Sequence, residues 1–81
     1  NPVTEIRFDV PRSGGGDVQL NIYDLLGHPV KNLVNSSKDP GTYSVTWDAK
    51  NNNGYQVSAG MYLFQLRSGT YVQTRKMVLL K

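Results

Sequence analysis

The period of the apolar residues is the feature that most constrains the fold of this chain. Residues 4–10 read TEIRFDV, in which apolar and polar side chains alternate, and residues 18–24 and 42–48 repeat the alternation. No window shows the i, i+3, i+4, i+7 apolar spacing of an amphipathic helix. Because successive side chains of a strand point to opposite faces of its sheet, the alternation predicts an all-β chain.

Segments rich in glycine, proline, asparagine and serine divide the alternating stretches. Strands are predicted at residues 4–10, 18–24, 29–34, 42–48, 61–67 and 71–81, with the last one the longest. Pro11 ends the first strand because proline cannot donate a ladder hydrogen bond, and residues 12–17 are expected to form a turn. The third strand begins at Pro29, which predicts a sheet edge, and residues 35–41 are expected to form a loop. A further short strand is expected to begin at Val57.

Six or seven short strands at this spacing predict an antiparallel β-sandwich or a small barrel. Residues 61–67 are apolar on both faces, as in a central strand that is covered from both sides. Tyr43 and Tyr62 are expected to point inward with their hydroxyls reaching the rim. Trp47 is the expected anchor of the core. The predicted core consists of Ile6, Phe8, Leu20, Ile22, Val45, Trp47, Tyr62 and Phe64.

Composition limits the function mainly by exclusion. The 81 residues predict one small domain, residues 1–81, and the absence of cysteine leaves neither a disulfide nor a cysteine metal site. The net charge of +3 is scattered, apart from Arg75 and Lys76, so nucleic-acid binding is not indicated. No apolar run approaches the roughly 20 residues of a membrane-spanning helix. The start at Asn1, without an initiator methionine, predicts a module of a longer protein.

No residue pattern points to catalysis, and no cofactor is predicted. The single histidine, His28, follows the turn glycine Gly27 and is expected to be an exposed loop residue. No serine stands in the glycine elbow that would present a nucleophile. The six acids are scattered over a domain too small for the deep cleft of a glycoside hydrolase. The chain is therefore predicted not to be an enzyme.

Two binding possibilities were weighed on single features. Residues 48–54 read DAKNNNG, but neither register places oxygen ligands at positions 1, 3 and 5 of a calcium loop. No metal site is therefore predicted, and Asp and Asn side chains that bond their own backbone are expected to shape a long turn. An adventitious calcium site stays open, as does a carbohydrate-binding platform built from Tyr23, Tyr55 and Tyr71.

The chain ends on RKMVLLK, its most hydrophobic run, at residues 75–81. Met77, Val78, Leu79 and Leu80 must point alternately to the two faces of a strand, so at most two of them can enter the core. One pair is expected to seal the sandwich. The other pair is expected to be covered by neighbouring loops or to lie in a shallow exposed patch. The sharper hypothesis adds that this pair, with Arg75, Lys76 and Lys81, forms a surface that a partner reads, and strand addition is one way of reading it.

Five segments carry a family resemblance: NPxTxIxF from Asn1, VxLxIYDxxGxxVxxL from Val18, GxYxVxWD from Gly41, GxxVxxGxY from Gly54, and RKMV from Arg75. Their order and spacing resemble the type A C-terminal sorting domain of proteins exported by the type IX, or Por, secretion system of Bacteroidetes. They are equally similar to the immunoglobulin-like domain of the flagellar hook-capping protein. Both resemblances imply a small antiparallel immunoglobulin-like β-sandwich of about six or seven strands.

The sorting-domain resemblance implies a non-catalytic signal module at the C-terminus of a larger secreted protein. Its partners would be the outer-membrane secretion machinery, a sortase-like peptidase and an upstream cargo domain, and the protein would reach the cell surface or the medium through the periplasm. The residues implied in recognition are Gly60, Met61, Tyr62, Arg75, Lys76, Met77, Val78, Leu79, Leu80 and Lys81. The alternatives are a structural or protein-interaction module of the hook-capping type and an accessory carbohydrate-binding domain of a secreted hydrolase.

Overall fold

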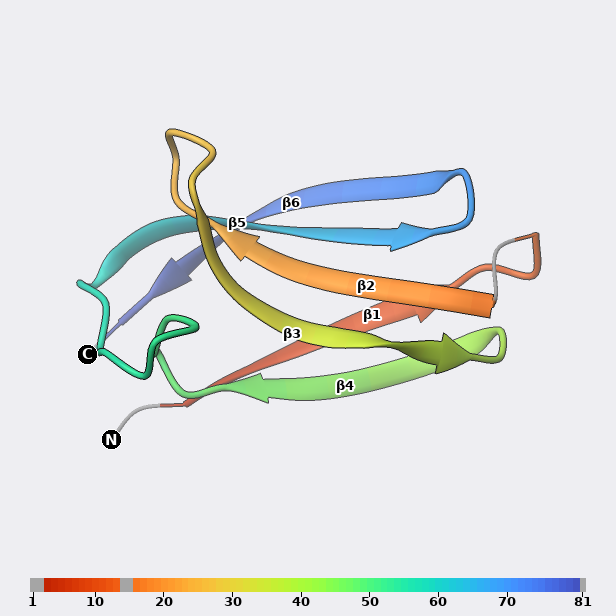
Figure 1. Cartoon of the computed structure of the whole chain (residues 1–81), viewed down its shortest axis with the longest axis horizontal. Coiled ribbons are helices and arrows are strands. Elements are labelled where there is room, and N and C mark those ends of the chain that lie inside the picture. Colours follow the sequence, from red (N-terminus) through yellow and green to blue (C-terminus); the bar gives the residue numbers. More distant parts are fainter. Residues whose placement is uncertain (1–2, 14–15, 81) are drawn as a thin grey trace.

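The alternating segments fold into six strands, which the computed structural model describes for residues 3–13 and 16–80 (Figure 1). The strands are β1 (Thr4–Val10), β2 (Gly16–Tyr23), β3 (Pro29–Lys38), β4 (Gly41–Trp47), β5 (Gly60–Ser68) and β6 (Tyr71–Leu79). They form a two-stranded sheet, β1-β4, and a four-stranded sheet in the order β3-β2-β5-β6. Every strand pair is antiparallel. The predicted all-β, immunoglobulin-like sandwich is confirmed.

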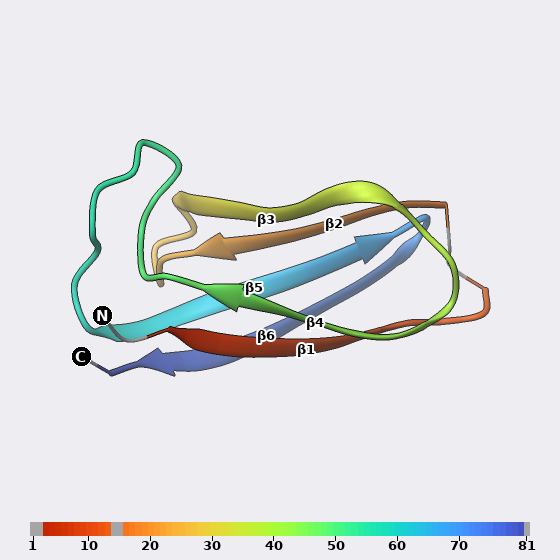
Figure 2. The ribbon, with the colours of Figure 1, turned by 90° about the horizontal axis from the view of Figure 1, so that it is seen from below.

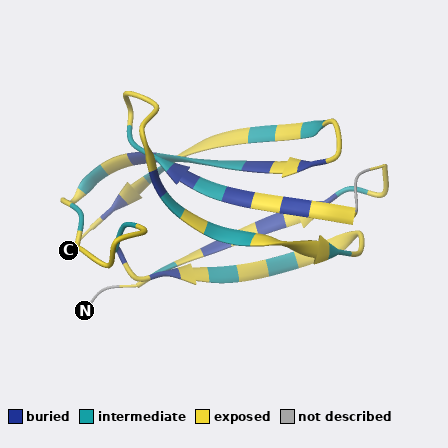
Figure 3. Cartoon of the chain, in the orientation of Figure 1, coloured by how far each residue is buried: buried dark blue, intermediate teal, exposed yellow. Residues whose placement is uncertain are grey.

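The two sheets pack face to face because each strand turns its apolar residues toward the other sheet (Figure 2). In β1, Ile6, Phe8 and Val10 are buried while the residues between them are exposed, and the bands of burial in Figure 3 follow this period of two. β2 supplies fully buried Leu20 and Ile22 from the facing sheet. The described residues include no helix with the length and apolar character needed to cross a bilayer.

Trp47 closes the core at the end of β4. It is fully buried, its ring meets that of Tyr62 edge to face at 5.3 Å between centroids, and its Nε1 donates to the carbonyl of Lys50 at 2.9 Å. Of the eight predicted core residues, all are buried except Val45 and Phe64, which are half-buried and pack against the core. Val45 lies on the two-stranded sheet and Phe64 on the four-stranded sheet, so each sheet has one predicted core residue that is only partly buried.

Tyr43 and Tyr62 brace the starts of β4 and β5 in the same way. The hydroxyl of Tyr43 donates to the carbonyl of Asp39, and that of Tyr62 donates to the carbonyl of Ser58, each at 2.6 Å. Each tyrosine thus ties its strand to the backbone four residues upstream, across a glycine with positive φ, as the tyrosine corner of immunoglobulin folds does. The predicted placement of both hydroxyls at the rim is confirmed.

The prediction for β3 was wrong in its extent. Residues 35–38, expected in a loop, continue the strand to Lys38, so that β3, at ten residues, is longer than β6 at nine. Polar Asn35 to Lys38 form a strand because they pair with the beginning of β2, from Gln19 back to Gly16. The edge position predicted from Pro29 is correct. Near Val57 there is a single bridge, Lys50↔Gln56, rather than a strand.

The prediction for β5 was half right. β5 is central, between β2 and β6, but nothing among the described elements covers its outer face. Met61 is 44% exposed on that face, and Leu63 is half-buried. Apolar residues on both faces of β5 therefore do not mean that both faces are covered by other parts of the protein. One face of β5 packs in the core, and the other is apolar but partly exposed to solvent.

Candidate interaction surface

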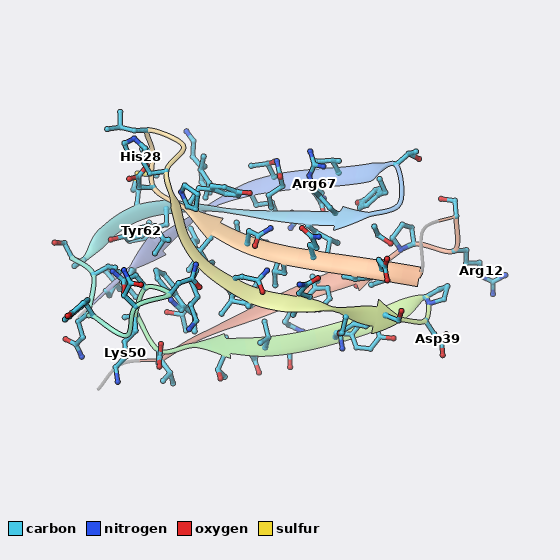
Figure 4. All side chains as sticks on the ribbon, viewed as in Figure 1. Arg12, His28, Asp39, Lys50, Tyr62 and Arg67 are labelled. Atoms are coloured by element: carbon cyan, nitrogen blue, oxygen red, sulfur yellow. The ribbon has the colours of Figure 1, made fainter. Side chains whose placement is uncertain are left out.

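His28, the single histidine, takes part in a hydrogen-bonded loop and not in a catalytic arrangement of side chains. His28 is exposed, and its Nδ1 lies 3.1 Å from Oδ2 of Asp24 (Figure 4). The other carboxylate oxygen of Asp24 accepts from the backbone N–H groups of Leu26 and His28, each at 2.9 Å. The hydrogen bond from the backbone of His28 is the main cause that lowers the pKa of the Asp24 carboxyl. Asp24 and His28 thus fasten the β2–β3 loop.

The asparagine-rich segment that was tested as a calcium loop uses its oxygens on its own backbone. Asn51 Oδ1 accepts from the N–H groups of Asn53 and Tyr55, both at 3.0 Å, and Asp48 Oδ1 accepts from Lys50. This geometry confirms the turn predicted for residues 48–54. Within the described residues, no three acidic or histidine side chains gather as metal ligands would.

The three tyrosines of the sugar-binding alternative lie in different settings. Tyr55 is 71% exposed in the β4–β5 loop, whereas Tyr23 and Tyr71 are half-buried on strands. Tyr71 packs against the core, so its ring contributes to the inner side of the sheet. The three rings therefore do not form one flat platform for a sugar.

The two parts of the predicted recognition segment lie side by side. β5 and β6 pair so that Gly60 faces Leu79, Met61 faces Val78 and Tyr62 faces Met77. Segments that are separated by a hairpin in sequence thus form adjacent rows at one end of the four-stranded sheet (Figure 1). Lys81, also predicted, lies outside the described residues.

The last apolar run divides between the two faces as the alternation predicts. Leu79 is fully buried and Met77 packs against the core, whereas Val78 is 55% exposed and Leu80 is 76% exposed. Val78 lies on the outer face opposite Met61. We refer to Met61, Val78 and Leu80 as the outer patch.

Sequence reasoning missed two further exposed apolar residues near this end, Leu25 and Leu26 at the tip of the β2–β3 loop. The loop lies beside the start of β5: Tyr23 pairs with Leu63, and Figure 4 places His28 and Tyr62 at the same end of the molecule. Burial raises the pKa of the Tyr62 hydroxyl, and the charge of Asp24 adds to the effect. The signal in the sequence was the pair of leucines inside a turn, where apolar residues are uncommon.

Cations without acidic partners lie on the same hairpin as the outer patch. All six acids of the chain lie at or before Asp48, whereas Lys50, Arg67, Arg75, Lys76 and Lys81 follow it. The ion pair found among the described residues joins Asp24 and His28, so Arg67, Arg75 and Lys76 carry charges that no carboxylate there neutralises. The β5–β6 hairpin is therefore an apolar and cationic surface without an acid.

Comparison with known proteins identifies the family. No curated protein matches the chain in sequence. The fold is similar to the crystal structure of FlgD from P. aeruginosa, with a TM-score of 0.74 over 96% of this chain and 22% sequence identity. This chain spans 60% of the length of that FlgD chain, and at this identity the likeness shows the fold alone. Residues 3–71 match the FlgD Ig-like domain, and since this range covers most of the sequence, the chain belongs to the FlgD Ig-like domain family.

Proposed function

We propose that this chain is a non-catalytic, structural and protein-interaction module, and that the outer patch, with Lys76 beside it on the same face, contacts its partner. The observation that carries the proposal is the directly paired, exposed couple Met61 and Val78 on an uncovered sheet face, extended by Leu80. Apolar groups that gather on the surface of a small domain mark contact sites or aggregation hazards. Membership in the FlgD Ig-like family supports an interaction role.

The family match ends at residue 71, where β6 begins. The similarity to the FlgD fold covers 96% of this chain and therefore reaches β6, whereas the recognition role proposed for β6 is supported by exposure and charge alone. The P. aeruginosa FlgD structure is longer than this chain, so a neighbouring domain of the same polypeptide is one partner of the right kind.

A photo-crosslinking residue placed at Val78 in the full-length protein, in its native cell, tests the proposal. A matched probe at Thr46, exposed on the outer face of the other sheet, serves as the control. We expect one defined adduct from position 78 and none from position 46. Equal labelling from both positions, or none from either, would count against a partner at the outer patch.

A finer proposal is that the partner is a secretion machinery and that the module is an export address. The observation that favours it is the division of the last strand into a buried Leu79 and an outward pair, Val78 and Leu80, beside the segment 60–62. On this proposal the outer-membrane machinery of type IX secretion and a sortase-like peptidase read the outer patch. The protein then acts at the cell surface or in the medium.

Export of a reporter fused upstream of the chain separates the finer proposal from the coarser one. Removing residues 76–81 also removes buried Leu79, so the sharper variant is Val78→Ser with Leu80→Ser, which changes the outward pair alone. We expect the double variant to fold and to stay inside the cell. Unchanged export of this variant refutes the address and leaves a general interaction module.

A further inference from the structure

β6 has a free edge on the outside of the four-stranded sheet. β6 ends the four-stranded sheet and pairs with β5 without a register shift from Gly60↔Leu79 to Ser68↔Tyr71. The backbone hydrogen bonds found among the described residues outside the ladders involve other segments. β1 comes near β6 where β1 begins and β6 ends, and the two strands diverge toward Tyr71 (Figures 1 and 2). Along most of its length, therefore, β6 offers an unbroken row of backbone donors and acceptors.

The opposite edge of the same sheet is closed over the first part of β3, residues 29–32. Asn52, from the β4–β5 loop, donates its backbone N–H to the carbonyl of Val30 at 2.9 Å, and its Oδ1 accepts from the N–H of Asn32 at 3.0 Å. β3 also begins at a proline and carries two register shifts against β2. Proline, irregularity and loop cover are the devices by which proteins prevent strand addition. The chain applies all three at β3, while the ladder of β6 is regular and its strand contains no proline.

The charges beside the β6 edge favour some added strands over others. Arg67, Arg75 and Lys76 lie on β5 and β6, and the 33 residues after Asp48 contain no acid. If two copies paired through the middle of β6, the adjacent cations of one copy would face those of the other, and like charges across a strand pair are destabilising. The same cations attract a strand that carries carboxylates. A second copy of this chain is therefore disfavoured, and an acidic segment is favoured.

The side chains of β6 define what such a strand must look like. Val72, Thr74 and Lys76 alternate along the outer face, with Val72 45% exposed. Arg75 pairs with Phe64 on the other face but is exposed, because the two-stranded sheet does not reach over it. A complementary strand therefore places β-branched residues beside Val72 and Thr74 and carboxylates beside Arg75 and Lys76.

We propose that β6 receives an extended acidic segment of a partner protein as a fifth strand of this sheet. The proposal rests on the interaction function proposed above and names the partner's chemistry. Main-chain hydrogen bonds along the edge supply the affinity, and the cations supply the specificity and the register. A lipid headgroup or a nucleic acid satisfies the cations but leaves the backbone edge unpaired, so the edge favours a peptide.

Peptide titration of the 81-residue chain, followed by NMR of the backbone amides, tests the proposal. The probe is a capped peptide of about nine residues, long enough to span β6, with two adjacent glutamates among threonine and valine, so that one carboxylate lies on each face, beside Arg75 and beside Lys76. One matched peptide has lysine in place of glutamate, and another keeps the glutamates but is N-methylated at alternate residues. Phosphatidylserine vesicles and inorganic polyphosphate serve as anions without a strand.

We expect the acidic peptide to shift the amides of β6 more than those of β3 and to protect the β6 amides from hydrogen exchange. The lysine and N-methylated peptides should bind at least tenfold more weakly, because each lacks one of the two required features. Lys76→Glu should weaken binding by roughly tenfold, since it turns an attractive cross-strand pair into a repulsive one. Arg12→Glu makes the same change of charge in an exposed turn at the opposite end of the molecule from Tyr62 and the outer patch, and should leave binding within about twofold (Figure 4).

Equal binding of the N-methylated peptide, or equal binding of vesicles or polyphosphate, would overturn strand addition in favour of plain anion attraction. Absence of binding by the acidic peptide would also overturn it. If crosslinks from position 78 persist in that case, the interaction function stands and the edge is not its means. If those crosslinks are absent as well, both proposals fail.

Discussion

At the residue scale, a few side chains hold the sandwich closed. Trp47 is fully buried, contacts Tyr62 and donates to Lys50 at the point where the chain leaves β4. Tyr43 and Tyr62 fix the starts of two strands, and Asp24 fixes one loop. Each of these side chains forms a hydrogen bond to the backbone of a neighbouring loop, and these bonds fix the loops relative to the strands.

Replacing Trp47 by alanine should cost about 3–5 kcal/mol, the usual range for deleting a large buried aromatic group. In a domain of this size that loss approaches the whole free energy of unfolding. Tyr55→Ala is the matched control, because Tyr55 is 71% exposed, and it should change stability by less than about 0.5 kcal/mol. Urea denaturation measures both, and similar midpoints for the two variants would contradict the role given to Trp47.

Tyr43→Phe and Tyr62→Phe should each cost about 1 kcal/mol, because each removes one hydroxyl and leaves the carbonyl of Asp39 or Ser58 without it. The two tyrosines lie on different sheets, so the double variant should show the sum of the two losses. Thermal unfolding of the three variants provides the measurement. A double variant no less stable than the singles would show that the two braces act as one.

Asp24 predicts a dependence of stability on pH. Its folded-state pKa lies below the ordinary value of 3.8, so its stabilising contribution is present above 3.8 and is lost as the pH falls through the folded-state pKa. Asp24→Asn keeps an oxygen acceptor but lacks the charge. The difference in urea midpoint between the parent and this variant should therefore be larger at pH 7 than at pH 2.5. An unchanged difference would mean that the charge of Asp24 contributes nothing.

At the scale of the element, β6 has two unlike faces. Leu79 is buried in the core, while Val78, its neighbour in sequence, is exposed on the outer patch. One face of this apolar run therefore packs in the core, and the other face is exposed on the surface, where a partner can contact it. This division followed from the alternation of strand side chains and was predicted from the sequence.

Leu79→Ala should destabilise the domain by about 2–5 kcal/mol, because it empties a fully buried site. Val78→Thr keeps the β-branched shape on the exposed face and should shift stability by no more than about 0.5 kcal/mol. Circular dichroism during thermal melting compares the two. Equal losses would show that Val78 is as structural as Leu79.

Other features of the elements could not be predicted from local sequence. Asn35 to Ser37 form part of β3 because β2 lies beside them, and nothing in their polar side chains reports that neighbour. Asn52 closes the edge of β3 from a loop twenty residues away, a contact that no local pattern encodes. The outer face of β5 was expected to be covered because Met61 and Leu63 are apolar. The sequence alone does not distinguish apolar residues that pack in a core from apolar residues on an exposed surface.

At the scale of the whole molecule, one edge of the four-stranded sheet is covered where β3 begins, the β6 edge is open, and the open side carries cations and an apolar patch. The six acids lie in the first 48 residues, so the charge is divided along the chain as well as across the sheet. The sandwich itself is shared with the FlgD Ig-like family, which matches residues 3–71.

The central claim is that the outward side of β6 serves recognition and not folding. The most direct measurement is the yield of the adduct from a crosslinker at Met61 in the full-length protein, with and without Val78→Thr and Leu80→Thr, alongside the melting temperature of each form. We predict that the double variant melts within a few degrees of the parent and loses the adduct, since only exposed side chains change. A retained adduct at full yield, or a variant that no longer folds, would contradict the claim.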